Sequence, residues 1–142
     1  MVNSVLVAMD DSPLSREALS FALDAFPDAE ITVVHVAYPE IDMLPADVNE
    51  VYDAAPDELD GVGDEAAQTV FEAIREVADG RDLSVTFLMG ETDRRLVEYT
   101  DEGGFDHVVL GTHGRSGLSR LLIGSVAESV VRETDVPTTL VR

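Results

Sequence analysis

The stretch that decides the fold runs from residue 108 to residue 125 and reads VVLGTHGRSGLSRLLIGS. It opens with an apolar run containing β-branched residues, which is typical of a buried strand. Glycines and small polar residues follow, and the helical spacing of apolar residues resumes after Ser125. A strand that leads through a glycine loop into a helix is an arrangement that binds phosphate. The first N–H groups of the helix lack internal partners, the helix dipole is positive there, and glycine lets an anion approach the backbone.

The glycines of this stretch have a defined spacing. Two residues separate Gly111 from Gly114, and nine separate Gly114 from the pair Gly124 and Ser125. This pattern resembles the G-2x-G-9x-G-[S/T] nucleotide motif of the universal stress protein family. The resemblance covers the whole chain, since residues 5–10, 33–36 and 136–141 are similar to the family's first strand with its aspartate, its second strand and its closing strand.

Strand and helix signals alternate along the chain. Apolar runs predict strands at residues 4–9, 31–37, 83–89, 105–110 and 138–141. Helical spacing predicts helices from Pro13 behind the N-cap Ser12, over about residues 64–79, from about residue 92 to Gly103, and from Ser125. The alternation predicts an α/β fold with an open, doubly wound, five-stranded parallel sheet and helices on both faces. The resemblance implies a Rossmann-like strand order of 3-2-1-4-5, and the length fits a single domain over residues 1–142.

Residues 38–63 are the least regular part of the sequence. They contain three prolines and many acidic residues. We expect a long acidic loop with a short helical turn near residues 47–53. A loop of this length is either a functional lid or a solvated insertion, and the residues favour neither.

The resemblance implies a role for residues at the ends of the strands. Asp10 would accept hydrogen bonds from ribose hydroxyls, and Val36 would meet the adenine edge through its backbone N–H and C=O. Gly111 would lie against the ribose. Each residue also has a purely structural interpretation, because Asp10 can be a turn acid at the start of a helix and a strand valine is ordinarily part of the core.

The same resemblance implies that the ligand is ATP. Its phosphates would be held by Gly114, Gly124, Ser125 and the N–H of Val126. Mg²⁺ would arrive with the nucleotide and reach Asp10 or the next aspartate through water. A purely structural interpretation treats the glycines as turn residues and the serine as a helix cap.

Hydrolysis has no identifiable machinery in this sequence. The chain contains no lysine, so a Walker lysine is impossible, and no arginine finger or positioned glutamine is apparent. The histidines are not spaced as metal ligands; we interpret His35 and His107 as structural, while His113 lies in the glycine loop. We therefore expect ATP binding with little or no hydrolysis, no catalytic residues and no protein metal site.

The charge of the chain is unusual. Twenty-nine acidic residues face nine basic ones, all of them arginine, for a formal net charge of −20. Such a chain repels itself in dilute buffer, whereas molar salt shortens the Debye length to about 3 Å. The composition favours a halophilic origin over an acidic protein of ordinary salt conditions. It also argues against a nucleic-acid partner, and Arg115 and Arg120 would supply local positive charge near phosphates or pair with acids.

The remaining expectations concern partners and compartment. No apolar run approaches the ~20 residues of a membrane span, and no signal peptide is apparent, so we expect a cytoplasmic protein without membrane contact. The strand Thr138–Val141 would lie at a sheet edge, and in the resembling family this strand pairs across a two-fold axis, which predicts a homodimer. We expect an ATP-binding stress-response dimer. The alternative is a dimer of the same type that binds no nucleotide and acts through protein contacts.

Two other nucleotide or signalling folds are excluded by the strand ends. A dinucleotide-binding domain requires GxGxxG in the first βα turn, where residues 10–13 contain no glycine. A response-regulator receiver requires a phosphoacceptor aspartate after the third strand, which here ends in Leu88, Met89 and Gly90. An electron-transfer flavoprotein-like domain shares the fold class, but no flavin signal accompanies it.

Overall fold

A computed structural model describes residues 2–10, 12–37, 51–54, 65–112 and 123–142, with the backbone alone at 51–54. The strands are β1 (Ser4–Ala8), β2 (Glu30–Ala37), β3 (Val51–Ala54), β4 (Ser84–Met89), β5 (His107–Gly111) and β6 (Thr138–Val141). The helices are α1 (Pro13–Ala25), α2 (Glu65–Ala78), α3 (Thr92–Glu102) and α4 (Ser125–Glu133). The predicted alternation of strands and helices is confirmed.

The strands form one sheet in the order β3-β4-β2-β1-β5-β6. The five parallel strands β4-β2-β1-β5-β6 have the predicted order 3-2-1-4-5 when they are counted along the chain without β3. β1 lies at the centre, and β6 lies at one end of the sheet. The central position of β1 explains why its sequence is apolar at consecutive residues, since both of its faces are covered.

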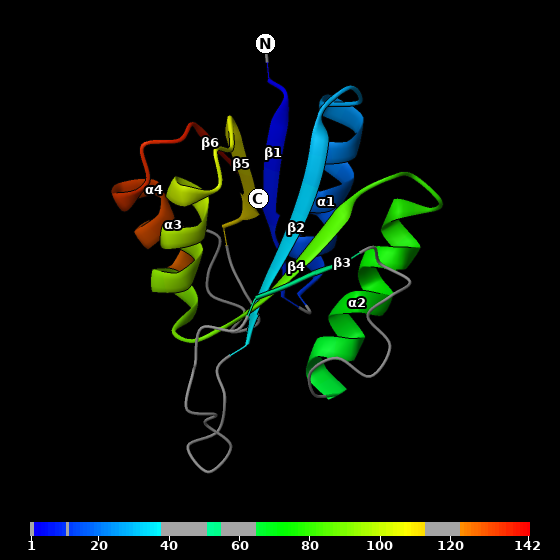
Figure 1. The fold of residues 1–142 in the computed structure, drawn as a ribbon, viewed down its shortest axis with the longest axis horizontal. Coiled ribbons are helices and arrows are strands. Elements are labelled where there is room, and N and C mark those ends of the chain that lie inside the picture. Colours follow the sequence, from blue (N-terminus) through cyan, green and yellow to red (C-terminus); the bar gives the residue numbers. More distant parts are fainter. Residues whose placement is uncertain (1, 11, 38–50, 55–64, 113–122) are drawn as a thin grey trace.

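Helices cover both faces of the sheet, as Figure 1 shows, with α1 and α2 on one side and α3 and α4 on the other. Val5 and Val7 belong to the core cluster shared with α1 and α2, whereas Leu6 between them belongs to the cluster shared with α3 and α4. All three side chains are fully buried. The two clusters are the two halves of a core that the sheet divides.

One expectation for the acidic segment is wrong. A helical turn was expected near residues 47–53, but Val51–Ala54 form β3, which pairs antiparallel with β4 from Val51↔Leu88 to Ala54↔Val85. The pairing covers the N–H and C=O groups along the outer edge of β4, which the five-stranded sheet would leave open. Residues 38–50 and 55–64 lie outside the described residues.

Glycine and serine define the ends of helices. Ser12 Oγ accepts a hydrogen bond from Ser15 N–H at 3.3 Å and so caps α1, with Pro13 in the first turn, as predicted. After α2, Gly80 has a φ of +82°, a left-handed conformation that glycine adopts without steric cost. No helix in the described residues is long and apolar enough to cross a membrane.

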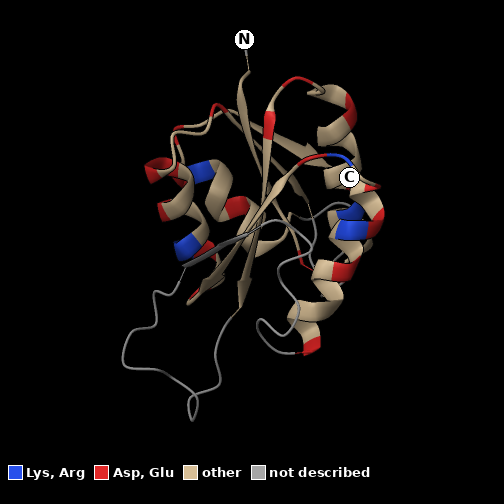
Figure 2. Cartoon of the chain, turned by 45° about the vertical axis from the view of Figure 1, so that its right-hand side comes forward, with Lys and Arg blue, Asp and Glu red and all other residues tan. Residues whose placement is uncertain are grey.

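Acidic residues are spread over the helices and turns of the described chain, as Figure 2 shows in red. Several of the arginines pair with them at the surface: Arg16 with Glu76 at 2.8 Å between α1 and α2, and Arg132 with Glu128 at 3.0 Å within α4. These side chains are well exposed, so each pair contributes little, at most about 1 kcal/mol. The 29 acidic residues far outnumber the nine arginines, so the arginines are too few to pair with each of them.

Candidate functional site

The carboxyl ends of three adjacent strands bring the predicted site residues together. Asp10 follows β1, Val36 lies next to last in β2, and Gly111 ends β5. β1 pairs in parallel with both β2 and β5, and the β1–β5 register of Val7↔Val109 places the end of β5 beside the end of β1. β2 lies on one side of β1 and β5 lies on the other, so the strand order reverses at β1. Open α/β sheets bind ligands at the carboxyl ends of the strands where the order reverses.

The carboxylate of Asp10 is fixed by the first turn of α1. Its Oδ1 accepts hydrogen bonds from the N–H of Ser12 at 2.8 Å and from the hydroxyl of Ser15 at 2.8 Å. The N–H of Asp10 donates to the same Ser15 oxygen at 3.0 Å. The Ser15 hydroxyl therefore contacts both the backbone N–H and the carboxylate of Asp10, and it fixes the orientation of that residue. Sequence reasoning missed Ser15, although its position three residues after the N-cap is where capping side chains recur.

The main chain of Val36 faces the place where β1 leaves the sheet. Met9 N–H donates to Val34 C=O at 2.9 Å, so the backbone groups of Val34 face β1. Those of Val36, two residues later, face the same side, because backbone direction alternates along a strand. Within the described residues the pairing of β1 with β2 ends at Val34 and does not extend to Val36. The N–H and C=O of Val36 are thus directed toward the space beside Asp10.

The N-terminus of α4 is tied to the end of β5. Gly124 N–H donates to Thr112 C=O at 2.6 Å, and Thr112 N–H donates to Val141 C=O at 2.9 Å at the end of β6. Gly124 is the N-cap with an extended backbone, φ −63° and ψ 155°, and as a glycine it has no side chain to cap the helix. The first turn of α4 therefore starts at the carboxyl edge of the sheet, next to Gly111.

The first N–H groups of α4 have the character of an anion site. The first intrahelical bond runs from Glu128 N–H to Gly124 C=O at 2.9 Å. The N–H groups of Ser125 and Val126 precede it and have no intrahelical acceptor. Ser125 is exposed and Val126 is half-buried. Glu128 brings a negative charge to this turn, but its carboxylate pairs with Arg132. The start of α4 is therefore a partially positive helix end, which favours an anion.

Residues 113–122 of the glycine segment lie outside the described residues. They include the site residue Gly114, together with His113, Arg115 and Arg120. Of the residues predicted to hold a ligand, Asp10, Val36, Gly111, Gly124, Ser125 and Val126 are therefore placed at one edge of the fold, and Gly114 stays a prediction.

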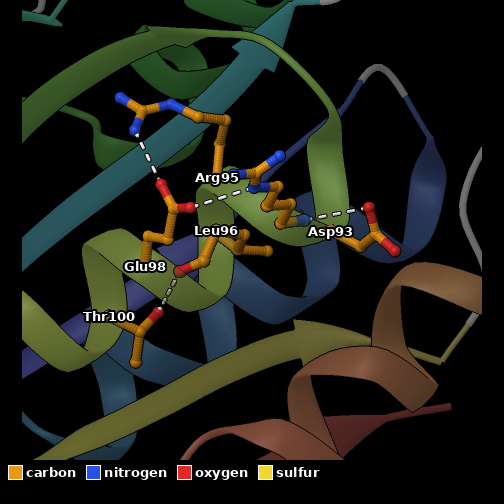
Figure 3. A network of polar contacts seen from close by, with 6 residues as sticks. Asp93, Arg95, Leu96, Glu98 and Thr100 are labelled. Carbon is orange, nitrogen blue, oxygen red and sulfur yellow. Dashed lines mark hydrogen bonds and ion pairs between the residues drawn. The ribbon is translucent and has the colours of Figure 1, made fainter. Parts of the chain in front are cut away.

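The start of α3 follows the carboxyl end of β4, at the same edge of the sheet as the candidate site. Gly90, which has a φ of +135°, donates its N–H to Ala37 C=O at 3.0 Å and so links the ends of β4 and β2. A Cβ on Gly90 would lie 2.8 Å from Cγ of Arg95, so the glycine makes room for the arginine side chain. Figure 3 shows the side chain of Arg95 extending to the carboxylate of Glu98, which lies in the next turn of α3. Hydrogen bonds from Arg94 and Arg95 hold the pKa of the Glu98 carboxyl below its usual range.

The two described histidines have structural partners, as predicted. His35 is buried, and its Nδ1 lies 2.9 Å from the carbonyl oxygen of Met9. His107 Nε2 lies 2.7 Å from the hydroxyl of Thr139, and burial lowers the pKa of the His107 imidazole. Among the described residues, no group of three or more His, Cys, Asp or Glu side chains could hold a metal ion.

The arrangement fits a nucleotide with its phosphates at α4. A helix N-terminus suits the phosphates, an oriented carboxylate at Asp10 suits ribose hydroxyls, and a backbone donor and acceptor at Val36 suit a base edge. The described fold and this edge define an open, doubly wound α/β protein with its candidate ligand-binding residues at the carboxyl ends of the strands.

Comparison with known proteins identifies the family. The model of the universal stress protein family matches residues 1–142, and the chain belongs to that family. It is 27% identical over 148 residues to universal stress protein YxiE of Bacillus subtilis, with 100% of both chains covered. Its fold is similar to that of UspA from Lactobacillus plantarum, with a TM-score of 0.76, 22% identity and coverage of 99% and 98%. It is also similar to a universal stress protein solved in complex with cAMP, with a TM-score of 0.69, 24% identity and coverage of 99% and 97%.

Proposed function

We propose that this protein binds ATP, carried as its Mg²⁺ complex, at the carboxyl edge of the sheet. The observation that carries the proposal is the position of the start of α4, which is bound directly to the end of β5 through Gly124 and Thr112. The N–H groups of Ser125 and Val126 would bind phosphate oxygens there, together with the glycine loop that contains Gly114. Six of the nine arginines lie from residue 94 onward, in the part of the sequence that contains the glycine segment and α4.

The remaining contacts define the nucleoside. Asp10, held by α1, would accept from the ribose hydroxyls, and Gly111 at the end of β5 leaves room for the sugar. The N–H of Val36 would donate to a ring nitrogen of adenine, and its C=O would accept from the exocyclic amine. The solved family member with cAMP supports an adenine nucleotide, because its ligand contains the same base, sugar and a phosphate.

The proposed role is binding without appreciable hydrolysis. Phosphoryl transfer to water requires a positioned nucleophile and strong charge stabilisation at the γ-phosphate. The sequence has no lysine to provide the latter. Residues 1–142 would act as one binding unit in a stress response.

The site is tested by adding a charge at the start of α4. The variant Ser125→Glu places a carboxylate at the positive end of the helix, which stabilises the helix by about 0.3–1 kcal/mol and repels phosphates. Titration calorimetry with Mg-ATP in molar KCl should show at least about a tenfold loss of affinity. The control is Ser84→Glu, which adds the same charge at an exposed position on the opposite edge of the sheet.

The same preparation decides between the two candidate functions. Denatured wild-type protein is chromatographed for nucleotide that was carried through purification, and adenine nucleotide near one per chain supports the proposal. A wild-type protein that carries no nucleotide and binds no added Mg-ATP contradicts it. That outcome favours the alternative, a family member that acts through protein contacts alone.

We further propose that the chain forms a homodimer through β6. The strand lies at the end of the sheet, and its outer N–H and C=O groups face away from β5. Polar Thr138 and Thr139 make this edge less apolar than a fully buried interface. Light scattering in molar KCl should give twice the chain mass of 15.3 kDa, and the mass of a single chain would contradict the dimer.

The charge supports a saline cytoplasm as the setting of this protein. The formal charge of −20 is screened at molar salt, whereas in dilute buffer it destabilises the compact state. A circular-dichroism melt should therefore give a higher melting temperature at 2 M than at 50 mM KCl. Equal melting temperatures would contradict the halophilic assignment.

A further inference from the structure

The N–H of Val36 is kept out of the sheet by a side chain of its own strand. Met9 N–H donates to Val34 C=O, so the C=O of Met9 also faces β2. In a parallel ladder that continued, this carbonyl would accept from the N–H of Val36. It accepts from His35 instead, whose Nδ1 lies 2.9 Å from the Met9 oxygen. A carbonyl oxygen only accepts, so Nδ1 carries the hydrogen of this bond.

The ring of His35 approaches the carbonyl from outside the plane of the sheet. It packs against Phe71 of α2 and Phe87 of β4, with ring centroids 6.3 Å and 6.0 Å away. Both phenylalanines belong to the core cluster on the α1 and α2 face. The bond therefore draws the Met9 carbonyl toward that face and away from the ladder direction, where Val36 lies.

The backbone after Met9 is held away from β2 as well. Asp10 N–H donates to Ser15 on α1, so β1 turns toward its helix immediately after Met9. The peptide unit between Met9 and Asp10 is thus held at both of its polar groups: its C=O is bound by His35 and its N–H by Ser15. Both bonds act on the peptide unit that would otherwise continue the β1–β2 pairing as far as Val36.

We propose that His35 is a positioning residue of the nucleotide site: by binding the Met9 carbonyl, it keeps the N–H of Val36 available to adenine. This inference rests on the proposed function, because it requires that the base lies at Val36. His35 itself touches no ligand in this role. A histidine that merely fills the core would have no effect on the hydrogen bonding of Val36.

The matched pair His35→Asn and His35→Leu tests this role. The amide nitrogen of asparagine stands at the same covalent distance from the backbone as Nδ1 of histidine, so it can donate to Met9. Leucine has nearly the shape of asparagine and no donor. Both variants remove the same part of the ring beside Phe71 and Phe87, so both leave a similar cavity. A buried amide is less favourable than a buried leucine. If His35 only filled the core, the asparagine variant would therefore be the less stable of the two.

The first measurement needs no ligand. Amide hydrogen exchange of Val36 is followed by NMR in molar KCl for the wild type and both variants. We expect rapid exchange in the wild type and in His35→Asn, and exchange about tenfold slower in His35→Leu, since the Met9 carbonyl can then accept from Val36. An unchanged exchange rate in His35→Leu overturns the proposal whatever the nucleotide does.

The second measurement uses ATP and tripolyphosphate, a probe that lacks the base. His35→Leu should bind ATP about tenfold more weakly and tripolyphosphate unchanged, while His35→Asn should bind both as the wild type does. Equal ATP affinity in the leucine variant overturns the role of His35 and leaves the proposed function intact. A wild type that binds neither probe overturns the proposed function, and with it the role of His35 toward adenine.

Discussion

Replacing Ser125 by proline separates the fold of α4 from its proposed function. Ser125 is the first residue of α4, and the preceding Gly124 has φ −63° and ψ 155°. Proline favours an extended conformation in the residue before it, and it is well suited to the first helical position. The described backbone can therefore accept Ser125→Pro without rearrangement.

The structure gives opposite expectations for stability and for binding. The N–H that proline removes has no intrahelical acceptor, because the first such bond of α4 starts at Glu128 N–H. The free energy of unfolding should stay unchanged or rise by up to about 1 kcal/mol, since proline restricts the unfolded chain. A hydrogen bond to a charged group contributes about 1.5–3 kcal/mol. Loss of the N–H should therefore weaken ATP binding roughly 10- to 150-fold.

The assay combines titration calorimetry with Mg-ATP and a urea melt, both in molar KCl. Ser125→Ala removes only the hydroxyl and should retain more affinity than Ser125→Pro. Glu128→Pro is the structural contrast, because it removes the bond to Gly124 C=O and should cost about 3 kcal/mol. Unaltered ATP affinity in Ser125→Pro would refute the phosphate site at α4, and a loss of stability as large as that of Glu128→Pro would refute the described start of the helix.

Three further predictions concern the fold. Gly103→Ala should lower the free energy of unfolding by about 1–3 kcal/mol, because its Cβ would lie 2.4 Å from Cε2 of Phe105; a urea melt equal to wild type would contradict this. Leu96→Ala should cost about 2–5 kcal/mol at a side chain that is 1% exposed, whereas Val131→Ala, at 46% exposed, should stay within about 0.5 kcal/mol in the same melts. Burial lowers the pKa of His107, so its stabilising contribution is complete above about pH 6.5 and is lost as the pH falls through the lowered pKa. Wild type should therefore lose more stability than His107→Gln between about pH 7 and pH 5, and a constant difference between the two would contradict the assignment.

The parallel core was predictable because its signals are local. Each central strand is an apolar run, and Ser12 and Gly80 mark helix ends through their own side-chain and backbone chemistry. β3 was missed for the opposite reason. Its four residues lie within an acidic, proline-containing segment, and only pairing with β4, more than 30 residues later in the chain, defines it as a strand.

The site was predictable in its positions and less so in its contacts. A turn acid at Asp10 and a helix starting at Ser125 follow from strand ends and spacing. The bond from Ser15 to Asp10 and the bond from His35 to Met9 do not, because they depend on how a helix and a neighbouring strand meet in space. His35 reads as a core histidine from the sequence alone, and its donor role is visible only in three dimensions.

The central place of β1 has a consequence for how the chain is made. β1 leaves the ribosome before the other described strands, yet one of its two neighbours is β5, where Val5 pairs with His107. Until β5 is synthesised, one edge of this central strand has no partner. We expect folding to be slow for a chain of this size, because its decisive contact closes a long loop. A nascent chain halted before β5 would present that edge to other chains, so this protein should depend on complete synthesis to escape aggregation.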